Sequence, residues 1–521
     1  MSDKEKAEFS EKQTTKEMAT ETPNVMHIES NELDYDAQRL HDLGYKQEFS
    51  RSLDMFVQFG FAFSTMAVLP SWSVGFGPAL NSGGPTTLFF GWIVVASFVT
   101  LIGLGMAEIV SAMPTAGGVY YWCFKLSNEK YGPFAAWMAG YTYLIGLLAV
   151  NMTLAYGGAQ FIIGMVGIGT GNFIQPEGAY VGIYVGLLVL AGVVNLFGTK
   201  VTGIINKFIV LWALIGTAII VIAMPVMAPT HQSAKWVFTE FINNTGYENV
   251  GNVFLLGMLQ AGWTLIGYET SAQIVEETHR ADIAAPRGII ISILGAWVQG
   301  LVLILAVLFS IQDVDTVASA TVPIAELFQS TTNNPHLAIF FLFILLGAQL
   351  GSLFNSILAC GHLIWAMARD GCLPYSKFFY KLSNGSHTPV RAIMLQLAIC
   401  IVIIMPSFAT PVFWQAILSA AVIAVNISYG LPFLCRLLFT RNIPLDGPFR
   451  LGKFSIPLNV ISLAWITFFS VILCFPSVSP VGPQTMNYAS LMIGGVLIFA
   501  LFFWFVSGRH FYKGPLQNAD H

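Results

Sequence analysis

The chain has 521 residues, of which 55% are hydrophobic and only 10% are charged, and its mean hydropathy is +0.67. Soluble domains carry about 25% charged residues, so this composition excludes a soluble globular protein and indicates one embedded in a lipid bilayer. The formal net charge of −4 says little about a partner, and we expect no nucleic-acid ligand.

The first fifty residues differ from the rest of the chain. Residues 1–50 contain 12 acidic and 6 basic residues, with few aromatic residues and no apolar run that could act as a cleavable signal. We therefore expect a cytosolic, mostly disordered tail. Residues 42–51 (DLGYKQEFSR) look more like a structured lead into the first membrane span.

Twelve apolar stretches are candidates for membrane-spanning helices. Residues 86–107, for example, form a charge-free run that exceeds the roughly 18 apolar residues typical of a transmembrane helix. The pattern predicts an all-α membrane protein with twelve transmembrane helices. We expect spans near residues 55–80, 86–112, 134–165, 180–199, 207–228, 251–275, 288–310, 336–366, 391–408, 412–435, 456–475 and 488–507.

The basic residues orient these spans. Of the 24 Lys and Arg residues, 23 lie in the tails or in alternate connections, and Lys235 alone lies on the other side. Loops rich in Lys and Arg stay cytoplasmic during insertion, so both termini are expected in the cytoplasm. We expect the plasma membrane, with the vacuolar membrane as the alternative. Asn243, in the longest outer loop, begins an Asn-Asn-Thr glycosylation sequon.

The first span is irregular near its middle. Ser64 and Thr65 carry hydroxyls that compete for backbone hydrogen bonds, and Pro70 lacks an N–H group. The features predict a break in this helix.

The sixth span contains an acidic residue, Glu269, within the segment 262–271 (GWTLIGYETS). A charge at a helix centre costs about 2.5–3.5 kcal/mol on insertion scales, so Glu269 is a functional candidate. Gly262 and Gly267 weaken the helix, and we expect a second break here, whose freed backbone groups would meet protein, ligand or water. The alternative is that the glycines permit close helix packing and Glu269 is a hydrogen-bonded structural acid.

Breaks in the first and sixth spans are typical of two inverted five-helix repeats with a substrate site between the broken helices. The eighth span adds a stripe of polar residues at helical spacing, which we expect to face the bundle interior. His362 lies at the end of this stripe, and we favour an interhelical hydrogen bond over a proton relay as its role. The candidates for lining the pathway are Gln349, Ser352 and Asn355 in the eighth span, Tyr156 and Gln160 in the third, and Asn426 in the tenth.

Several motifs resemble those of the amino acid–polyamine–organocation transporters. They are residues 114–120 (PTAGGVY) preceded by Glu108, residues 276–278 (EET), and residues 368–374 (ARDGCLP). The similarity covers roughly residues 45–505. Residues 43–48 (LGYKQE) and 449–452 (FRLG) resemble the fungal amino-acid/choline branch, which includes γ-aminobutyrate permeases.

The resemblance implies the five-plus-five inverted-repeat fold first seen in a bacterial leucine transporter. The core would comprise residues 51–440, with repeats at about 51–228 and 251–436. Two additional helices would follow in 441–507, and a cytosolic tail in 508–521.

The resemblance also implies roles for site residues. The spacing of Trp263, Ile266, Gly267 and Glu269 is that of the bacterial arginine/agmatine antiporters, in which the Trp closes over the substrate. By this resemblance Trp263 is the gate, Ile266 and Gly267 offer backbone groups to a substrate amine, and Glu269 is a proton or amine partner. The N–H groups of Ser64, Thr65 and Met66 would bind its carboxylate. Phe63-Ser64-Thr65 replaces the family's Gly-Ser-Gly. Glycine permits a close approach to the backbone, and its replacement puts that approach in doubt here.

We therefore expect a secondary active transporter that moves small amine-bearing solutes by alternating access, with an amino acid or γ-aminobutyrate as the substrate. Proton coupling through Glu269 or His362, exchange and facilitated diffusion remain open. One alternative is transport of choline, held by an aromatic cage of Phe61, Trp263 and Tyr268, or of a polyamine or vitamin precursor. Another is a nutrient sensor with little flux. The sequence contains no catalytic, metal-ligand or phosphate-binding motif, so we expect no enzyme, metal or cofactor.

Overall fold

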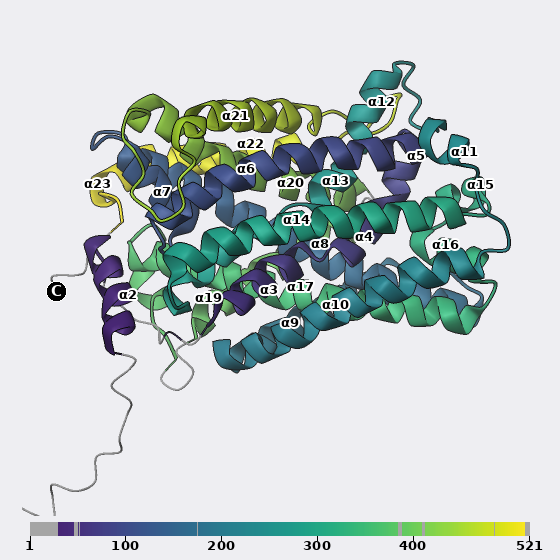
Figure 1. The fold of residues 1–521 in the computed structure, drawn as a ribbon, viewed down its shortest axis with the longest axis horizontal. Coiled ribbons are helices and arrows are strands. Elements are labelled where there is room, and N and C mark those ends of the chain that lie inside the picture. The colour runs from purple at the N-terminus through teal and green to yellow at the C-terminus, as the bar shows by residue number, and fades with distance from the viewer. Residues whose placement is uncertain are drawn as a thin grey trace, which may run out of the picture.

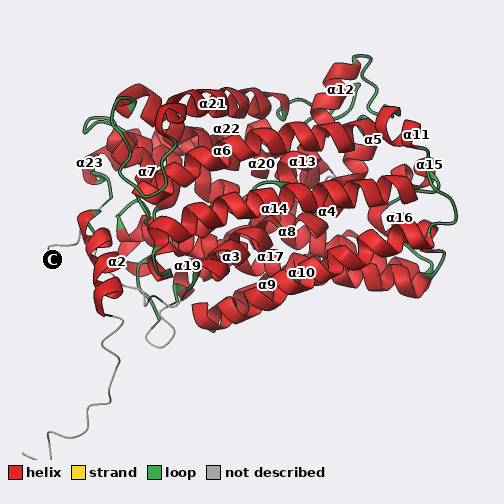
Figure 2. Cartoon of the chain, viewed as in Figure 1, coloured by secondary structure: helices red, strands yellow, loops and turns green. Residues whose placement is uncertain are grey.

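The computed structural model describes residues 30–45, 51, 53–173, 176–383, 388–408, 412–483 and 485–515, and these fold as a bundle of helices (Figures 1 and 2). Eleven helical segments in this part of the chain are long and apolar enough to cross a membrane, and Val390–Ile403 is a shorter apolar helix. The predicted all-α class and the twelve spans are confirmed. The shorter ninth span ends before Pro406, which cannot donate to a helix.

The spans follow one another in the predicted order. They are α3 (Met55–Met66) with α4 (Val68–Asn81); α5 (Gly84–Thr86), η1 (Thr87–Gly91) and α6 (Trp92–Ala112); α8 (Gly132–Thr170); α9 (Glu177–Leu196); α10 (Thr199–Met227); α12 (Val250–Gly257), α13 (Leu259–Thr264) and η2 (Tyr268–Glu277); α14 (Ala281–Ser310); α17 (Pro335–Arg369); α19 (Val390–Ile403); α20 (Val412–Cys435) and η4 (Arg436–Thr440); η5 (Gly452–Phe454) and α21 (Ser455–Ile472); α22 (Ala489–Phe503), η6 (Trp504–Gly508) and α23 (Arg509–Phe511).

Shorter helices lie in the connections and at the N-terminal side. They are α2 (Ser30–Asp42), α7 (Gly118–Leu126), α11 (Ala234–Thr239), α15 (Val314–Ser319), α16 (Pro323–Thr332), α18 (Ser376–Phe379) and η3 (Met405–Phe408).

Both predicted helix breaks are present. The first span changes direction at Ala67, whose φ of 42° is left-handed, and α4 begins at the next residue. Pro70 is tolerated because it falls in the first turn of α4, where backbone N–H groups have no helical partner. The sixth span unwinds after Thr264 and resumes at Tyr268 as a 3₁₀ helix, and Gly267 between them has a φ of 102°.

The packing of the spans shows the internal symmetry of an inverted repeat. The third span, α8, packs against the tenth and ninth spans, and the eighth span, α17, packs correspondingly against the fifth and fourth. The two broken helices pack against each other in antiparallel fashion. The first half of the first span, α3, contacts the second half of the sixth span, η2, and the second half of the first span, α4, contacts α13. This arrangement places the two breaks beside each other at the centre of the bundle.

The two ends of the bundle carry different connections. Helices α2, α7 and α23 lie at one end, together with the marked C-terminus, and α11, α15 and α16 lie at the other (Figure 1). We call these the α2 end and the α16 end.

Part of the segment that we expected to be mostly disordered is helical. Helix α2 spans Ser30–Asp42, and the side chains of Leu40 and Tyr45 are buried against the bundle. Residues 1–29 and 46–50 of the predicted tail lie outside the described residues.

Candidate functional site

A closed cavity of about 10 Å³ lies where the two broken helices meet. This is about the volume that one water molecule needs. Six of the nine predicted substrate-binding residues line it, and the other lining residues come from the first, third, sixth, eighth and tenth spans. The lining consists of Thr65, Met66, Ser71, Leu147, Val150, Leu154, Trp263, Ile266, Gly267, Glu269, Thr270, Ser356 and Val425.

Glu269 is the charged group of this cavity. Its side chain is 1% exposed. Tyr143 Oη donates to its Oε1 at 3.0 Å, and Tyr429 Oη donates to its Oε2. No ion pair among the described residues includes Glu269. An ionised Glu269 would therefore take its counter-charge from a ligand or give up its charge to a proton.

The unwound segment of the sixth span is hydrogen-bonded to the same tyrosine, Tyr429, that donates to Glu269. Gly267 N–H donates to Tyr429 Oη at 3.3 Å, so one hydroxyl joins the unwound backbone to the Glu269 carboxylate. A Cβ at Gly267 would lie 3.1 Å from Thr65 Cγ2. The two breaks thus approach closely because residue 267 has no side chain.

Two polar atoms of the cavity lining are left without a hydrogen bond within the described part of the chain. They are Trp263 Nε1 and Ser356 Oγ, and both residues are buried. Buried polar groups normally have a partner. These two atoms are available to a bound ligand.

An open vestibule lies between the cavity and the α16 end. It has a volume of about 460 Å³ and includes Tyr156 and Gln160 in its lining. The Tyr156 ring stacks on that of Trp414 with 3.6 Å between ring centroids. The residues that line it are apolar or polar and uncharged.

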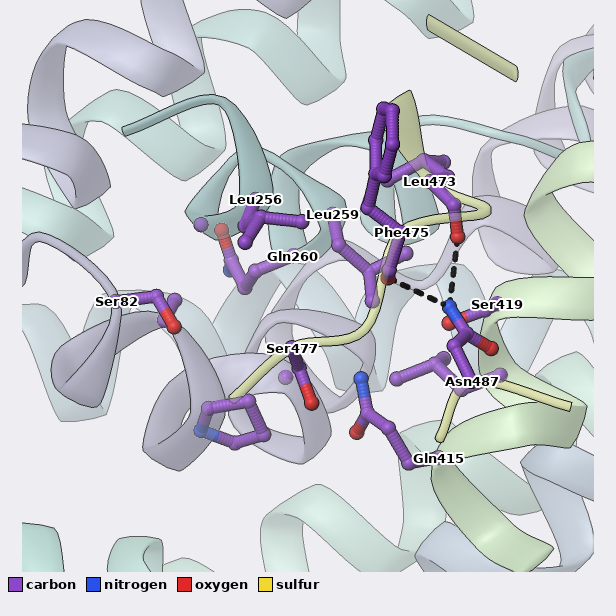
Figure 3. Close-up of a pocket in the computed structure, with 15 residues that line it drawn as sticks. Ser82, Leu256, Leu259, Gln260, Gln415, Ser419, Leu473, Phe475, Ser477 and Asn487 are labelled. Atoms are coloured by element: carbon purple, nitrogen blue, oxygen red, sulfur yellow. Dashed lines mark hydrogen bonds between the residues drawn. The ribbon is translucent and has the colours of Figure 1, made fainter. Parts of the chain in front are cut away.

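A smaller pocket of about 30 Å³ adjoins this vestibule, and Figure 3 shows Gln260, Gln415, Ser419 and Asn487 around it. Asn487 Nδ2 donates to the carbonyls of Leu473 and Phe475, at 2.8 and 3.1 Å. On α13, Trp263 lines the central cavity, one helical turn after Gln260 of this outer pocket.

Other predicted residues hold the first span in place beside the cavity. Ser64 Oγ donates to Asn206 Oδ1, and Asn355 Nδ2 donates to Ser64 Oγ at 3.1 Å and to Asn206 Oδ1 at 2.9 Å. Ser352 Oγ donates to the Thr65 carbonyl at 2.6 Å. The polar stripe of the eighth span thus faces the bundle interior and binds α3.

The remaining candidates do not line the central cavity. Phe61 packs in an apolar cluster with Leu53, Val57, Ile274, Leu358 and Ala359. The Tyr268 ring lies 5.2 Å from that of Tyr429, and His362 Nε2 lies 3.3 Å from Glu277 Oε1. Gln349 donates to the Leu154 carbonyl and Asn426 to the Val422 carbonyl, at 2.8 and 2.9 Å.

Asn243 lies in the connection at the α16 end. Its Nδ2 donates to the Tyr247 carbonyl at 2.6 Å, while Thr245 of the same sequon donates to its Oδ1. The Asn243 side chain is exposed.

The sequence did not single out the residues that complete the site. Tyr143 and Tyr429 are single tyrosines within apolar spans, and Leu147, Val150 and Leu154 read as ordinary helix packing. Their spacing of three and four residues places these three on one helical face. That signal could have identified a cavity-facing stripe, but only once α8 was known to lie opposite the breaks.

Replacement of Tyr429 by Phe tests this hydrogen-bond group. We expect uptake to fall by about tenfold or more, because the variant loses the hydroxyl that positions both Gly267 N–H and Glu269, and a hydrogen bond to a charged group is worth about 1.5–3 kcal/mol. Tyr184→Phe is the matched control, since its buried hydroxyl donates only to the Cys400 carbonyl. Equal activity of the two variants would contradict the role of Tyr429.

A small cavity between two broken helices at the centre of an inverted-repeat bundle is the arrangement of membrane transporters. The model of the amino acid permease family matches residues 53–498, and the chain belongs to this family. It is 32% identical to the amino-acid permease BAT1 of Arabidopsis thaliana, over 92% of this chain and 96% of that protein. It is 30% identical to amino-acid permease 2 of Neurospora crassa, over 96% and 92% of the two chains.

Proposed function

We propose that this protein carries amino acids across a membrane by alternating access, with the substrate bound in the central cavity. The observation that carries the proposal is Glu269, a buried carboxylate beside an unwound backbone segment, with no basic side chain in the cavity lining. A zwitterion suits such a site. Its ammonium group would pair with Glu269, and its carboxylate would accept from backbone N–H groups at the breaks.

The cavity walls favour neutral amino acids. Leu147, Val150 and Val425 present apolar surface opposite the breaks. An acidic side chain would enter a cavity whose one charged residue is also acidic, which is unfavourable. Phe61 and Tyr268 do not line the cavity, so an aromatic cage for choline has less support. γ-Aminobutyrate remains a candidate because it is itself a zwitterion.

The conformation supports a cycle with two gates. The vestibule at the α16 end is open, the cavity is closed, and the α2 end is sealed by buried ion pairs. There Arg369 lies 3.6 Å from Glu276 and 3.5 Å from Asp370, and Tyr120 donates to Asp370 at 2.6 Å. The cavity must widen to hold an amino acid, which requires Trp263 and the broken helices to move.

The sidedness follows from the sequence. We place both termini and the α2 end in the cytoplasm, because the Lys and Arg residues concentrate on that side, and we place the protein in the plasma membrane. We also propose that Glu269 takes part in proton coupling. His362 is less suited to that role, since it pairs with Glu277 away from the cavity.

Uptake of labelled solutes into vesicles that contain only the purified protein tests the function. We expect saturable uptake of neutral amino acids, with little uptake of glutamate or choline. Thermal stabilisation of the purified protein by the same solutes would report binding independently. Binding without flux would favour the nutrient sensor, and stabilisation by choline alone would contradict the proposal.

A further inference from the structure

Helix α2 and the residues that follow it form a strap across the α2 end of the bundle. We use strap for residues 35–45, which precede the first span and contact the start of α14, the helix that follows η2. The contacts fall into three groups, at the start of α14, at the end of α6, and beside Arg369.

The first group joins the strap to the start of α14. Tyr35 Oη donates to Asp282 Oδ2 at 3.0 Å, and the Arg280 N–H donates to Asp36 Oδ2 at 2.9 Å. Arg280 has a left-handed φ of 48°, a strained conformation for a residue with a side chain. Asp36 therefore supplies a carboxylate at the N-terminus of α14, where negative charge is favourable.

Arg51 connects this group to the first span. Its Nη1 donates to the Thr278 carbonyl at 2.7 Å, and its Nη2 donates to the Asp36 carbonyl at 3.2 Å. Leu53 pairs with the same segment, because its N–H donates to the Glu277 carbonyl at 3.0 Å. The strap, the start of α3 and the end of η2 are thus held as one unit.

The second and third groups fix the other side of the strap. Arg39 Nη2 donates to the Ala112 carbonyl at 3.2 Å and also to the Asp446 carbonyl. Tyr45 Oη donates to Asp370 Oδ2 at 3.3 Å, and the Arg369 guanidinium lies 4.0 Å from the centre of the Tyr45 ring. The strap therefore bridges the second span, the segment before α21, and the ion pairs that seal the α2 end.

We propose that the strap is an autoinhibitory contact: while it is bound, α3 and η2 cannot separate at the α2 end, and its release opens that end and raises transport. Broken helices must part for a solute to leave on this side. Arg51, just before α3, donates both to the end of η2 and to Asp36 of the strap, and so links the two half-helices to elements that do not line the cavity. A change that weakens it would act as a regulatory switch without altering the substrate site.

Two native cysteines report on opening of the two ends. Cys372 lies two residues after Asp370, its side chain is 1% exposed, and burial raises the pKa of its thiol, so it reacts slowly while the end is closed. Cys474 is partly exposed and lies at the α16 end, between Leu473 and Phe475 of the pocket in Figure 3.

The experiment compares the full-length double variant Tyr35→Phe/Asp36→Asn with the wild type. Maleimide labelling of each cysteine is followed by mass spectrometry in the purified protein, and uptake is measured in vesicles. We expect Cys372 labelling and uptake to rise about fivefold or more, since two contacts of the closed state are weakened, with Cys474 labelling unchanged. Tyr35→Phe alone should give a smaller rise.

The matched controls are Asp42→Asn, on the exposed side of the same helix, and Tyr131→Phe, an exposed tyrosine at the same end. Cys372 labelling no faster than in these controls would overturn the proposal. A parallel rise at Cys474 would indicate general loosening and would overturn it too, as would faster labelling without a rise in uptake of a transported solute. The labelling needs no substrate, so it stands apart from the proposed function.

Discussion

Replacement of Glu269 by Gln is expected to lower net uptake of neutral amino acids by at least about thirtyfold. The amide keeps the size of the carboxylate but removes the charge that pairs with the substrate ammonium, and loss of one partner of a buried charge pair costs about 2–5 kcal/mol. The variant should also lose accumulation driven by a pH gradient, while exchange of internal for external substrate stays measurable. Initial rates in vesicles at two external pH values give both results.

Glu240→Gln is the matched control for this variant. Glu240 is an exposed carboxylate in the connection at the α16 end, so its replacement should leave uptake and its pH dependence unchanged. Wild-type accumulation and pH dependence in Glu269→Gln would remove Glu269 from coupling. The structural alternative, in which Glu269 only accepts hydrogen bonds from Tyr143 and Tyr429, predicts a lowered melting temperature with substrate affinity intact.

Replacement of Gly267 by Ala should also lower uptake strongly, because it changes the backbone conformation at the break. At φ 102° a residue with a Cβ is strained, and a strained residue of this kind costs about 1–3 kcal/mol. The added methyl would also press on Thr65 across the narrow gap between the two breaks. We expect at least about tenfold slower uptake and a lower melting temperature in a thermal unfolding assay.

Gly182→Ala provides the comparison. Gly182 lies within α9 with no atom near the position of an added Cβ. Alanine is favoured over glycine inside a helix, so this variant should keep full uptake and an equal or higher melting temperature. Wild-type uptake in Gly267→Ala would show that the breaks need not approach closely for transport.

The spans and both breaks could be predicted because their causes are local. A long apolar run must form a helix in hydrocarbon, and Pro70 and Gly267 lie close to the two breaks, at Ala67 and after Thr264. Helix α2 could not be predicted this way. Its sequence is polar, and its position depends on partners such as Arg280 and Asp446, which are more than 200 residues away in the chain.

The site residues on the broken helices could be predicted from the sequence, and those on the opposite side of the cavity could not. Glu269 and Trp263 stand out in the sequence because a buried acid and a break are unusual in a membrane span. Tyr143 and Asn206 do not, since one tyrosine or asparagine in a span carries no sign of its partner. Phe61 shows the limit of proximity in sequence: it lies in the same half-helix as the first break but packs in a separate apolar cluster.

The length of α8 has a consequence for how the protein sits in its lipid. At 39 residues and 1.5 Å per residue it is about 58 Å long, nearly twice the roughly 30 Å thickness of the hydrocarbon layer. A helix of this length must tilt within the bilayer or extend beyond its hydrocarbon layer. Because Tyr156 and Gln160 of the vestibule lie in the second half of α8, we expect the depth of the vestibule in the membrane to follow the tilt of this helix.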